Sequence, residues 1–531
     1  MKRALYLPVV MVVLVLLMCS CFAGQPEDIV SKARFEETQT PAKAQPEDTQ
    51  SPSRENRSET RASLIPIAHL TSVQENVSLE KLSQNRALAV PREFHEMAGE
   101  LLDRPNFEDF DSVDAVIDHV SRTPDAVGLV PWDEVNPQVK ALTVDGESLL
   151  KPGAPNPESY PLRSGSATVP DPEELRQIVV AGDIVMDRGM PYAVFEEGRG
   201  IDFPLDGGYA AITSRTLVPN PYLESDLIHQ FEAERQGEPR AVREYLQSAD
   251  LTLANLENPV LEDATYHPED PTFHGDLRLL PVLEKAGIDG VTLGNNHILD
   301  AGFFGLEETL EHLRDVNISH VGAGMNLETA REPMIFDLRG TKVGILNYQG
   351  VPSYEWAWAT ENIPGTAPLQ EDVMREDIEN LRPRVDIVMV MPHWGREYIA
   401  EPESEQVELA RSAIDAGADL FVGGHAHWPK GIEVYRGKPI FYGTGNFLFD
   451  QAWSEETSTG IFADITLYKD RVVQARPIPF IILDRSQPNF LVLEAGGERA
   501  LNAIFSASLG PEFEAYEGSS PNSSEQASGQ D

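Results

Sequence analysis

Cysteine is almost absent from this chain, which has 2 cysteines in 531 residues. Both, Cys19 and Cys21, lie near the N-terminus, so no structural disulfide is available to the body of the chain. Basic residues are also scarce, with 42 lysines and arginines against 86 acidic residues and a formal net charge of −44. This charge repels nucleic acid and attracts divalent cations, so we expect no nucleic acid partner. The acidity also serves the simpler purpose of keeping an exposed protein soluble.

The N-terminal apolar run is too short for a membrane span. Lys2 and Arg3 precede the run ALYLPVVMVVLVLLM, which predicts a secretory signal over residues 1–20. MCSC resembles a bacterial lipoprotein box, in which small Ser20 precedes an acylated Cys21. We therefore expect lipidation of Cys21, with the membrane as a partner and an extracytoplasmic protein that is lipid-anchored to the bacterial cell membrane. An ordinary cleaved signal is the alternative.

Composition divides the rest of the chain. Residues 21–62 are polar and Pro-rich, which predicts a disordered tether. Residues 63–150 predict a small α/β domain, whose segment DAVIDHVSRTPDAVGLVP resembles one lobe of a periplasmic solute-binding protein; an accessory domain that binds nothing is the alternative. The Pro- and Gly-rich stretch 151–172 predicts a linker. We expect the main domain over 173–485, then a C-terminal extension, 486–531, with a disordered acidic tail.

The main domain alternates apolar strands with amphipathic helices, which is typical of an α/β fold. Helices such as ESEQVELARSAIDAGA place apolar residues at i, i+3, i+4 and i+7. The strands end in polar residues, and strand carboxyl ends line the ligand crevice of open α/β sheets. We expect these polar residues to converge on one site: Asp183, Glu257, Asn258, Asn296, His297, His393, His425, His427 and Asn446.

Carboxylate, amide oxygen and imidazole are ligands that suit Mn, Fe or Zn. One carboxylate can bridge two ions about 3.5–4 Å apart, as in two-metal phosphoryl-transfer sites. His425 and His427, two residues apart in VGGHAHWPKG, are expected to point the same way from an extended strand end, behind glycines that allow close backbone approach. The pattern therefore predicts a site for two divalent ions. A lone buried histidine, by contrast, is usually a core residue.

Six motifs carry a family resemblance: AGDIVMDRG, ANLENPV, LGNNHILDAG, MPHWGREY, GADLFVGGHAHWPKGIEVY and YGTGNFLFDQ. In this order they resemble the bacterial capsule-synthesis CapA family, linked to poly-γ-glutamate capsules and similar to calcineurin-like metallophosphoesterases. The resemblance implies an α/β sandwich of mixed sheets flanked by helices. It implies a capsule biosynthesis protein that is a metal-dependent phosphoesterase acting on a phosphoester substrate. The alternative is a non-hydrolytic assembly or export factor that binds metal and an anionic cell-surface polymer.

The resemblance also assigns roles to residues. His297 is implied to face the substrate as a catalytic residue, with Asp300 placed to orient it. We expect Arg188, Asn258 and Asn446 to contact the substrate. The family's usual first motif is Asp-x-His, whereas Val185 occupies the histidine position here, which leaves one ion a ligand short. The implied metal ligands are Asp183, Glu257, Asn296, His393, His425 and His427.

Overall fold

The computed structural model describes residues 61–153, 157–219, 227–265 and 272–508. The expected signal, the lipidation site Cys21, nearly all of the expected tether and the acidic tail from residue 509 onward lie outside these ranges. Within them, none of the helices combines the length and the apolar character that crossing a bilayer requires.

The small N-terminal domain is built on a five-stranded sheet in the order β4-β3-β5-β1-β6. Its helix α3 begins after Ser112, whose side chain accepts a hydrogen bond from the Ala115 backbone N–H, and it buries an apolar stripe against the sheet. The helix and the buried strand β5 confirm the elements expected here. The bounds are β1 (Leu64–His69), α1 (Leu79–Gln84), β3 (Leu88–Pro91), α2 (His95–Leu102), β4 (Glu108–Phe110), α3 (Val113–Arg122), β5 (Val127–Pro131) and β6 (Val139–Ala141).

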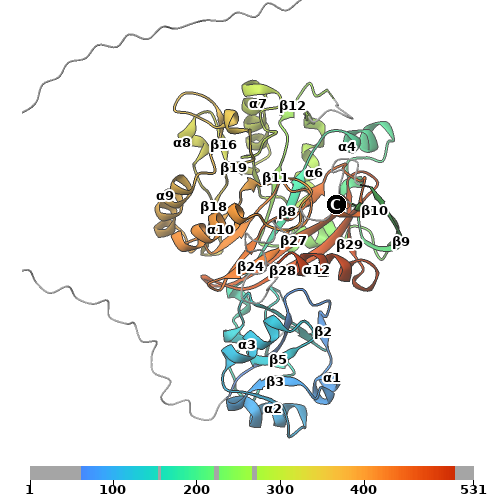
Figure 1. Cartoon of the computed structure of the whole chain (residues 1–531), viewed down its shortest axis with the longest axis vertical. Helices are drawn as coiled ribbons and strands as arrows, with labels where there is room; N and C mark the ends of the chain where they lie inside the picture. Colours follow the sequence, from blue (N-terminus) through green and yellow to red (C-terminus); the bar gives the residue numbers. More distant parts are fainter. Residues whose placement is uncertain (1–60, 154–156, 220–226, 266–271, 509–531) are drawn as a thin grey trace, which may run out of the picture. The chain divides into compact units, whose positions relative to one another are not determined.

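The main domain contains two large sheets, and the larger one is a ten-stranded mixed sheet (Figure 1). Its central strands β8, β11 and β14 run parallel, so their carboxyl ends lie at one edge. The strand order is β10 (Leu227–Gln236), β9 (Tyr209–Pro219), β29 (Gln487–Leu491), β28 (Arg471–Leu483), β27 (Thr459–Tyr468), β8 (Leu175–Ile184), β11 (Leu251–Leu256), β14 (Gly290–Thr292) and β15 (Ser319–Val321), with β26 (Asn446–Leu448) also paired to β8.

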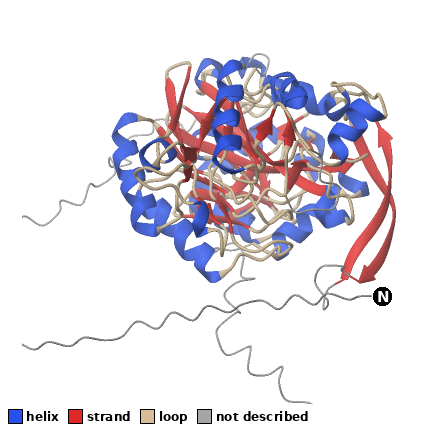
Figure 2. Ribbon diagram, turned by 90° about the horizontal axis from the view of Figure 1, so that it is seen from above, coloured by secondary structure: helices blue, strands red, loops and turns tan. Residues whose placement is uncertain are grey.

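The other large sheet has six strands, of which β18, β21, β23 and β25 are parallel. Its order is β17 (Met334–Leu338), β18 (Thr341–Leu346), β21 (Ile387–Val390), β23 (Leu420–Val422), β25 (Lys438–Phe441) and β24 (Ile432–Tyr435). The helices lie around the strands (Figure 2). The main ones are α5 (Ala241–Ser248), α6 (Leu280–Ala286), α7 (Gly302–Asp315), α9 (Glu371–Leu381), α10 (Ser404–Ala416) and α12 (Gly497–Ser506).

The two sheets pack face to face. Ile178 and Val180 of β8 share one apolar cluster with Ile387 and Met389 of β21. Val179, which points to the opposite face of β8, packs instead in the cluster that includes residues of α5, α6 and α7. Strands covered on both faces are expected to be apolar throughout, which explains the run QIVVAG. The expected architecture, mixed sheets flanked by helices with a small N-terminal α/β domain, is confirmed.

The ten-stranded sheet continues past residue 485, where we expected the main domain to end. Strand β29 pairs with β28 and β9 inside this sheet, and α12 follows it. The residues after 485 therefore complete the domain before the chain leaves the described ranges.

Candidate metal centre

The strand ends bring six potential metal ligands together. Asp183 lies near the end of β8, Glu257 directly after β11, and His393 in the short strand β22 (His393–Trp394) after β21. Asn296 follows β14, while His425 and His427 follow β23. All six are buried, with exposures of 3% or less. Two groups have ligand atoms within 4.8 Å of one another, and they share Glu257: Glu257, His425 and His427; Asp183, Glu257 and His393.

Two glycines allow this convergence. A Cβ on Gly182 would lie 1.9 Å from the Gly445 carbonyl oxygen, so only glycine lets β8 approach the 445 backbone. A Cβ on Gly424 would lie 3.0 Å from Asp183 Oδ1. The backbone N–H of His425 donates to Asp183 Oδ2 at 3.2 Å across this narrow gap. Gly424, directly before the histidine pair, thus allows that backbone to lie close to Asp183.

Glu257 is the most informative residue of the cluster. It is fully buried, its Oε1 lies 3.1 Å from His393 Nε2, and its Oε2 has no hydrogen-bond partner among the described residues. Burial raises its pKa, but the nearby His393 and His427 outweigh burial and lower the pKa to about 2, so the carboxylate is ionised. A buried, ionised carboxylate is unfavourable unless it is paired or binds a metal. Its environment therefore fits a cation ligand.

His393 supports the same conclusion. Its Nε2 atom lies 2.9 Å from Asn296 Oδ1, 3.1 Å from His425 Nδ1 and 3.1 Å from Glu257 Oε1. One imidazole nitrogen carries either one hydrogen or one lone pair, so it cannot satisfy three such neighbours. A cation accepts lone pairs from several of these atoms at once. The crowding around Nε2 is therefore typical of a set of metal ligands.

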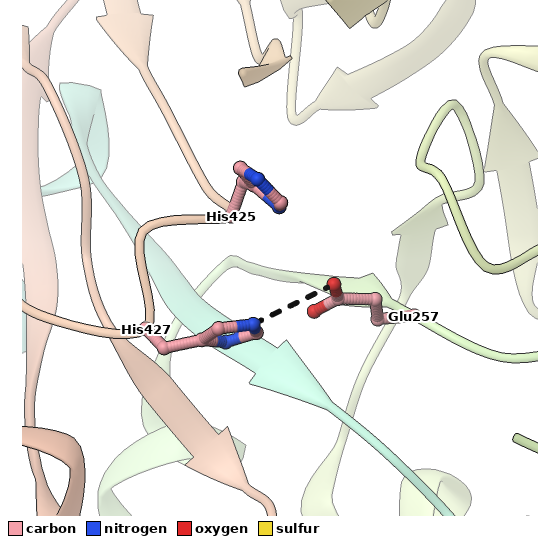
Figure 3. Close-up of side chains that lie close together, drawn as sticks. All are labelled: Glu257, His425 and His427. Atoms are coloured by element: carbon pink, nitrogen blue, oxygen red, sulfur yellow. Dashed lines mark ion pairs between the residues drawn. The ribbon is translucent and has the colours of Figure 1, made fainter. Parts of the chain in front are cut away.

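The tautomer of His427 directs a lone pair at Glu257. Asn446 Nδ2 donates to Gln451 Oε1 and to the Thr457 carbonyl, which leaves Asn446 Oδ1 as an acceptor for His427 Nδ1 at 2.9 Å. In the neutral form of His427, Nδ1 therefore carries the hydrogen and Nε2 carries the lone pair. This Nε2 lies 4.0 Å from Glu257 Oε1 (Figure 3). Two electron-rich atoms at that distance leave room for a cation between them.

The expected extended backbone for the histidine pair is wrong. Strand β23 ends at Val422, and His425 and His427 lie in the following loop with φ values of 87° and 55°. Left-handed backbone is uncommon for residues other than glycine and is concentrated at functional sites. Both side chains nevertheless lie beside Glu257 (Figure 3), because the backbone of the loop directs them there.

The carboxylates and imidazoles of the cluster shift one another's pKa values. Burial, and then the charge of Glu257, raise the pKa of Asp183 to about 6. Burial and the neighbouring His393 and His427 lower the pKa of His425, which keeps this imidazole neutral and able to bind metal. Burial lowers the pKa of His427, but Glu257 and Asp183 outweigh burial and raise it. A divalent cation would bind both carboxylates and accept lone pairs from the imidazole nitrogens.

His297 lies at the edge of this cluster and is more exposed than the six ligands, at 8%. Its Nδ1 is 2.8 Å from Asp300 Oδ2, the arrangement expected for an oriented imidazole. The ring of Phe273 packs against it with a centroid distance of 4.4 Å. Asn296 and His297 thus diverge, the first toward His393 and the second toward Asp300.

The three expected substrate contacts have different surroundings. The guanidinium of Arg188 lies over Phe273, 4.6 Å from the ring centroid, and the same ring packs against His297. Asn446 holds His427, as described above. Asn258 does not join the cluster, because its Oδ1 accepts from the Met186 N–H and its Nδ2 donates to the Pro259 carbonyl.

Asn255 was not anticipated. Its Nδ2 lies 2.9 Å from Asp183 Oδ1 and 3.2 Å from His393 Nδ1, so it orients two of the candidate ligands. The sequence contained an indication of this role, since Asn255 precedes Glu257 by two residues and residues i and i+2 share a strand face. Glu397 was also missed; its Oε1 lies 3.9 Å from His427 Nε2.

Comparison with known proteins supports the family resemblance. The chain is 34% identical over 223 residues to the PGA biosynthesis protein CapA of Bacillus subtilis, covering 41% of this chain and 58% of that protein. It is 31% identical over 230 residues to the capsule biosynthesis protein CapA of Bacillus anthracis, covering 42% and 56%. The chain thus spans less than two thirds of the length of these relatives.

Among solved structures, Haemophilus influenzae NAD nucleotidase is similar with a TM-score of 0.34 and 13% identity, covering 63% of this chain and 57% of that one. The family model described as bacterial capsule synthesis protein PGA_cap matches residues 177–451, which include all six candidate ligands. This match covers more than half of the chain, which therefore belongs to the PGA_cap family of bacterial capsule synthesis proteins.

Proposed function

We propose that this protein is a metal-dependent phosphoesterase that acts in poly-γ-glutamate capsule biosynthesis at the bacterial cell surface. The observation that carries the proposal is Glu257, a buried and ionised carboxylate that faces three histidines. The family membership and the names of the Bacillus relatives support the capsule role. The expected lipid anchor at Cys21 would hold the protein at the membrane.

The donor set fits one or two divalent cations. Asp183, Glu257 and His393 would hold one, while Glu257, His425 and His427 would hold the other, with Asn296 beside His393. Mixed carboxylate and imidazole ligands suit Mn, Fe or Zn. When bound, such an ion polarises a phosphoryl oxygen and stabilises the charge that develops there.

Residues next to the proposed metal ligands would bind the substrate and donate a proton to it. His297, fixed by Asp300, would present Nε2 to the leaving oxygen and hold the proton that this oxygen takes up. Arg188 would bind an anionic group of the substrate, since its guanidinium lies over Phe273, the ring that packs against His297. Asn446 keeps the lone pair of His427 directed into the cluster.

The test is turnover by Mn²⁺-loaded protein on a phosphomonoester, a phosphodiester and poly-γ-glutamate. The proposal predicts that phosphate or a phosphomonoester is released from at least one phosphoester, and that His297→Asn abolishes most of this release. Protein that binds metal at full stoichiometry and cleaves no phosphoester would contradict it.

A non-hydrolytic assembly factor is the second candidate. One observation favours it: Val185, at the position where the Asp-x-His pattern supplies a ligand, packs with Phe273 and Phe449 in an apolar cluster. A metal centre with a ligand missing there would retain metal and anion binding without the full chemistry. Binding of poly-γ-glutamate by metal-loaded protein, without cleavage of any substrate in the panel, would support this candidate.

A further inference from the structure

Lys430 is a buried ammonium group that the proposed reaction does not use. It lies three residues after His427, and its exposure is 0%. Its Nζ donates to the carbonyl oxygens of Ile399 and Glu401, each at 2.9 Å. A buried charge is unfavourable unless it is hydrogen-bonded, so the ammonium group and the two carbonyl oxygens must stay in contact. Lys430 therefore connects the loop after β23, residues 423–431, named the histidine loop here, to the segment that contains residues 399 and 401.

That segment, residues 395–401, follows β22 and is named the rim segment here. Two further backbone hydrogen bonds attach it to the histidine loop: Tyr398 N–H to the Ala426 carbonyl at 2.8 Å, and Gly431 N–H to the Ala400 carbonyl at 3.1 Å. Tyr398 has a φ of 61°, a conformation that is uncommon for residues other than glycine. The rim segment thus has a defined but unfavourable local shape, which contacts outside it must maintain.

The rim segment places an acidic and an aromatic side chain beside His427. The Oε1 atom of Glu397 lies 3.9 Å from His427 Nε2, and this side chain is 40% exposed. The Tyr398 ring centroid lies 5.9 Å from that of His427 and 5.2 Å from that of Trp453. Gln451 Nε2 donates to the Tyr398 hydroxyl at 3.4 Å. Together these groups form one wall next to a candidate metal ligand.

We propose that Lys430 is a positioning residue, which holds the rim segment so that Tyr398 and Glu397 form the wall of the substrate site beside His427. This inference rests on the proposed function, since it assigns a substrate to the metal centre. The wall would contact the group attached to the phosphoryl rather than the phosphoryl itself. An aromatic ring at this position favours a planar or ring-shaped group.

The test compares Lys430→Met with Lys438→Met in the full chain. Methionine fills the space of the lysine stem without the ammonium group. Lys438 is the control: its Nζ lies 2.7 Å from Asp419 Oδ1 at the six-stranded sheet, so it also pairs through Nζ, but with a residue outside the rim segment. Amide hydrogen exchange over residues 396–401 is expected to rise about 10- to 100-fold in Lys430→Met and to stay unchanged in the control.

Binding of two probes to Mn²⁺-loaded protein separates positioning from a general structural role. Inorganic phosphate reports the metal centre, and phenylphosphonate reports the metal centre together with the wall, without turnover. In Lys430→Met, phenylphosphonate binding is expected to weaken about tenfold, while phosphate binding and metal content stay unchanged. Tyr398→Ala should reproduce this loss, and the double variant should lose little more, since Lys430 acts through Tyr398.

Equal weakening of both probes, unchanged binding of both, additive losses in the double variant, or a wild type that binds neither probe would overturn the proposal. If Lys430→Met fails to fold, Lys430→Gln, which keeps a hydrogen-bond donor, is measured in the same way. A wild type that binds both probes but cleaves no phosphoester would refute the phosphoesterase function alone, because the probe ratio still reports the wall.

Discussion

Replacing Glu257 with glutamine removes one negative charge from the cluster and keeps the shape of the side chain. The two candidate ligand groups share this residue, so both should weaken in the same variant. One unit charge acting at 4 Å with an effective dielectric constant of about 20 is worth about 4 kcal/mol. The separation of 4.0 Å between Glu257 Oε1 and His427 Nε2 makes this distance a conservative choice, because a cation between them lies closer to each. We therefore expect metal affinity to fall at least about 1000-fold.

The assay is elemental analysis after gel filtration, together with Mn²⁺ titration by calorimetry and thermal unfolding with and without Mn²⁺. Wild-type Tm should rise with Mn²⁺, because a ligand that binds only the folded state stabilises it, whereas Glu257→Gln should show no such rise. Glu433→Gln is the control: Glu433 is equally buried, but it pairs with Arg411 and Tyr442. This control should lose stability and keep its metal. Full metal content in Glu257→Gln would refute the reasoning.

Three other predictions follow from the same sequence and structure. His297→Asn should keep its metal and lose about 10²–10⁴-fold in turnover on any phosphoester that the wild type cleaves, most of all with poor leaving groups; loss of metal would show that His297 is not the proton donor. Burial, and then the charge of Lys140, lower the pKa of the fully buried His69 to about 4 from 6.5. The unfolded chain therefore binds a proton that the folded chain refuses, and the free energy of unfolding in urea should fall by about 3 kcal/mol between pH 6.5 and 4. His69→Asn should remove that part of the pH dependence, and an unchanged pH profile would count against it. Cys21→Ala should release the protein from membranes or block its processing, whereas Cys19→Ala should not; lipid labelling that survives Cys21→Ala would exclude the anchor.

The sequence predicted that the candidate metal ligands lie close together, because their proximity follows from the order and direction of the strands. Asp183 lies near the end of β8, and Glu257 and His393 come after β11 and β21. The carboxyl ends of such buried parallel strands lie at one edge of a sheet. The apolar runs also predicted the strands, since both faces of β8 and β21 are covered. These features depend on local patterns, which a sequence displays directly.

The rest depends on contacts between distant segments. The left-handed backbone of His425 and His427 is maintained by the surrounding fold, and no local sequence pattern predicts it. Asn255 and Asn258 are both amides near the end of β11, but Asn255 reaches Asp183 while Asn258 bonds to nearby backbone. Residue type and spacing do not distinguish these two roles. Lys430 likewise carries no sequence sign that its ammonium group would lie buried against residues 399 and 401.

The metal content of the wild-type protein, purified without chelator and measured by elemental analysis, tests the central claim most directly. The shared carboxylate of Glu257 and the two ligand groups around it predict close to two equivalents of transition metal per chain. A protein that carries no metal, and takes up none when Mn²⁺ is added, would contradict the account.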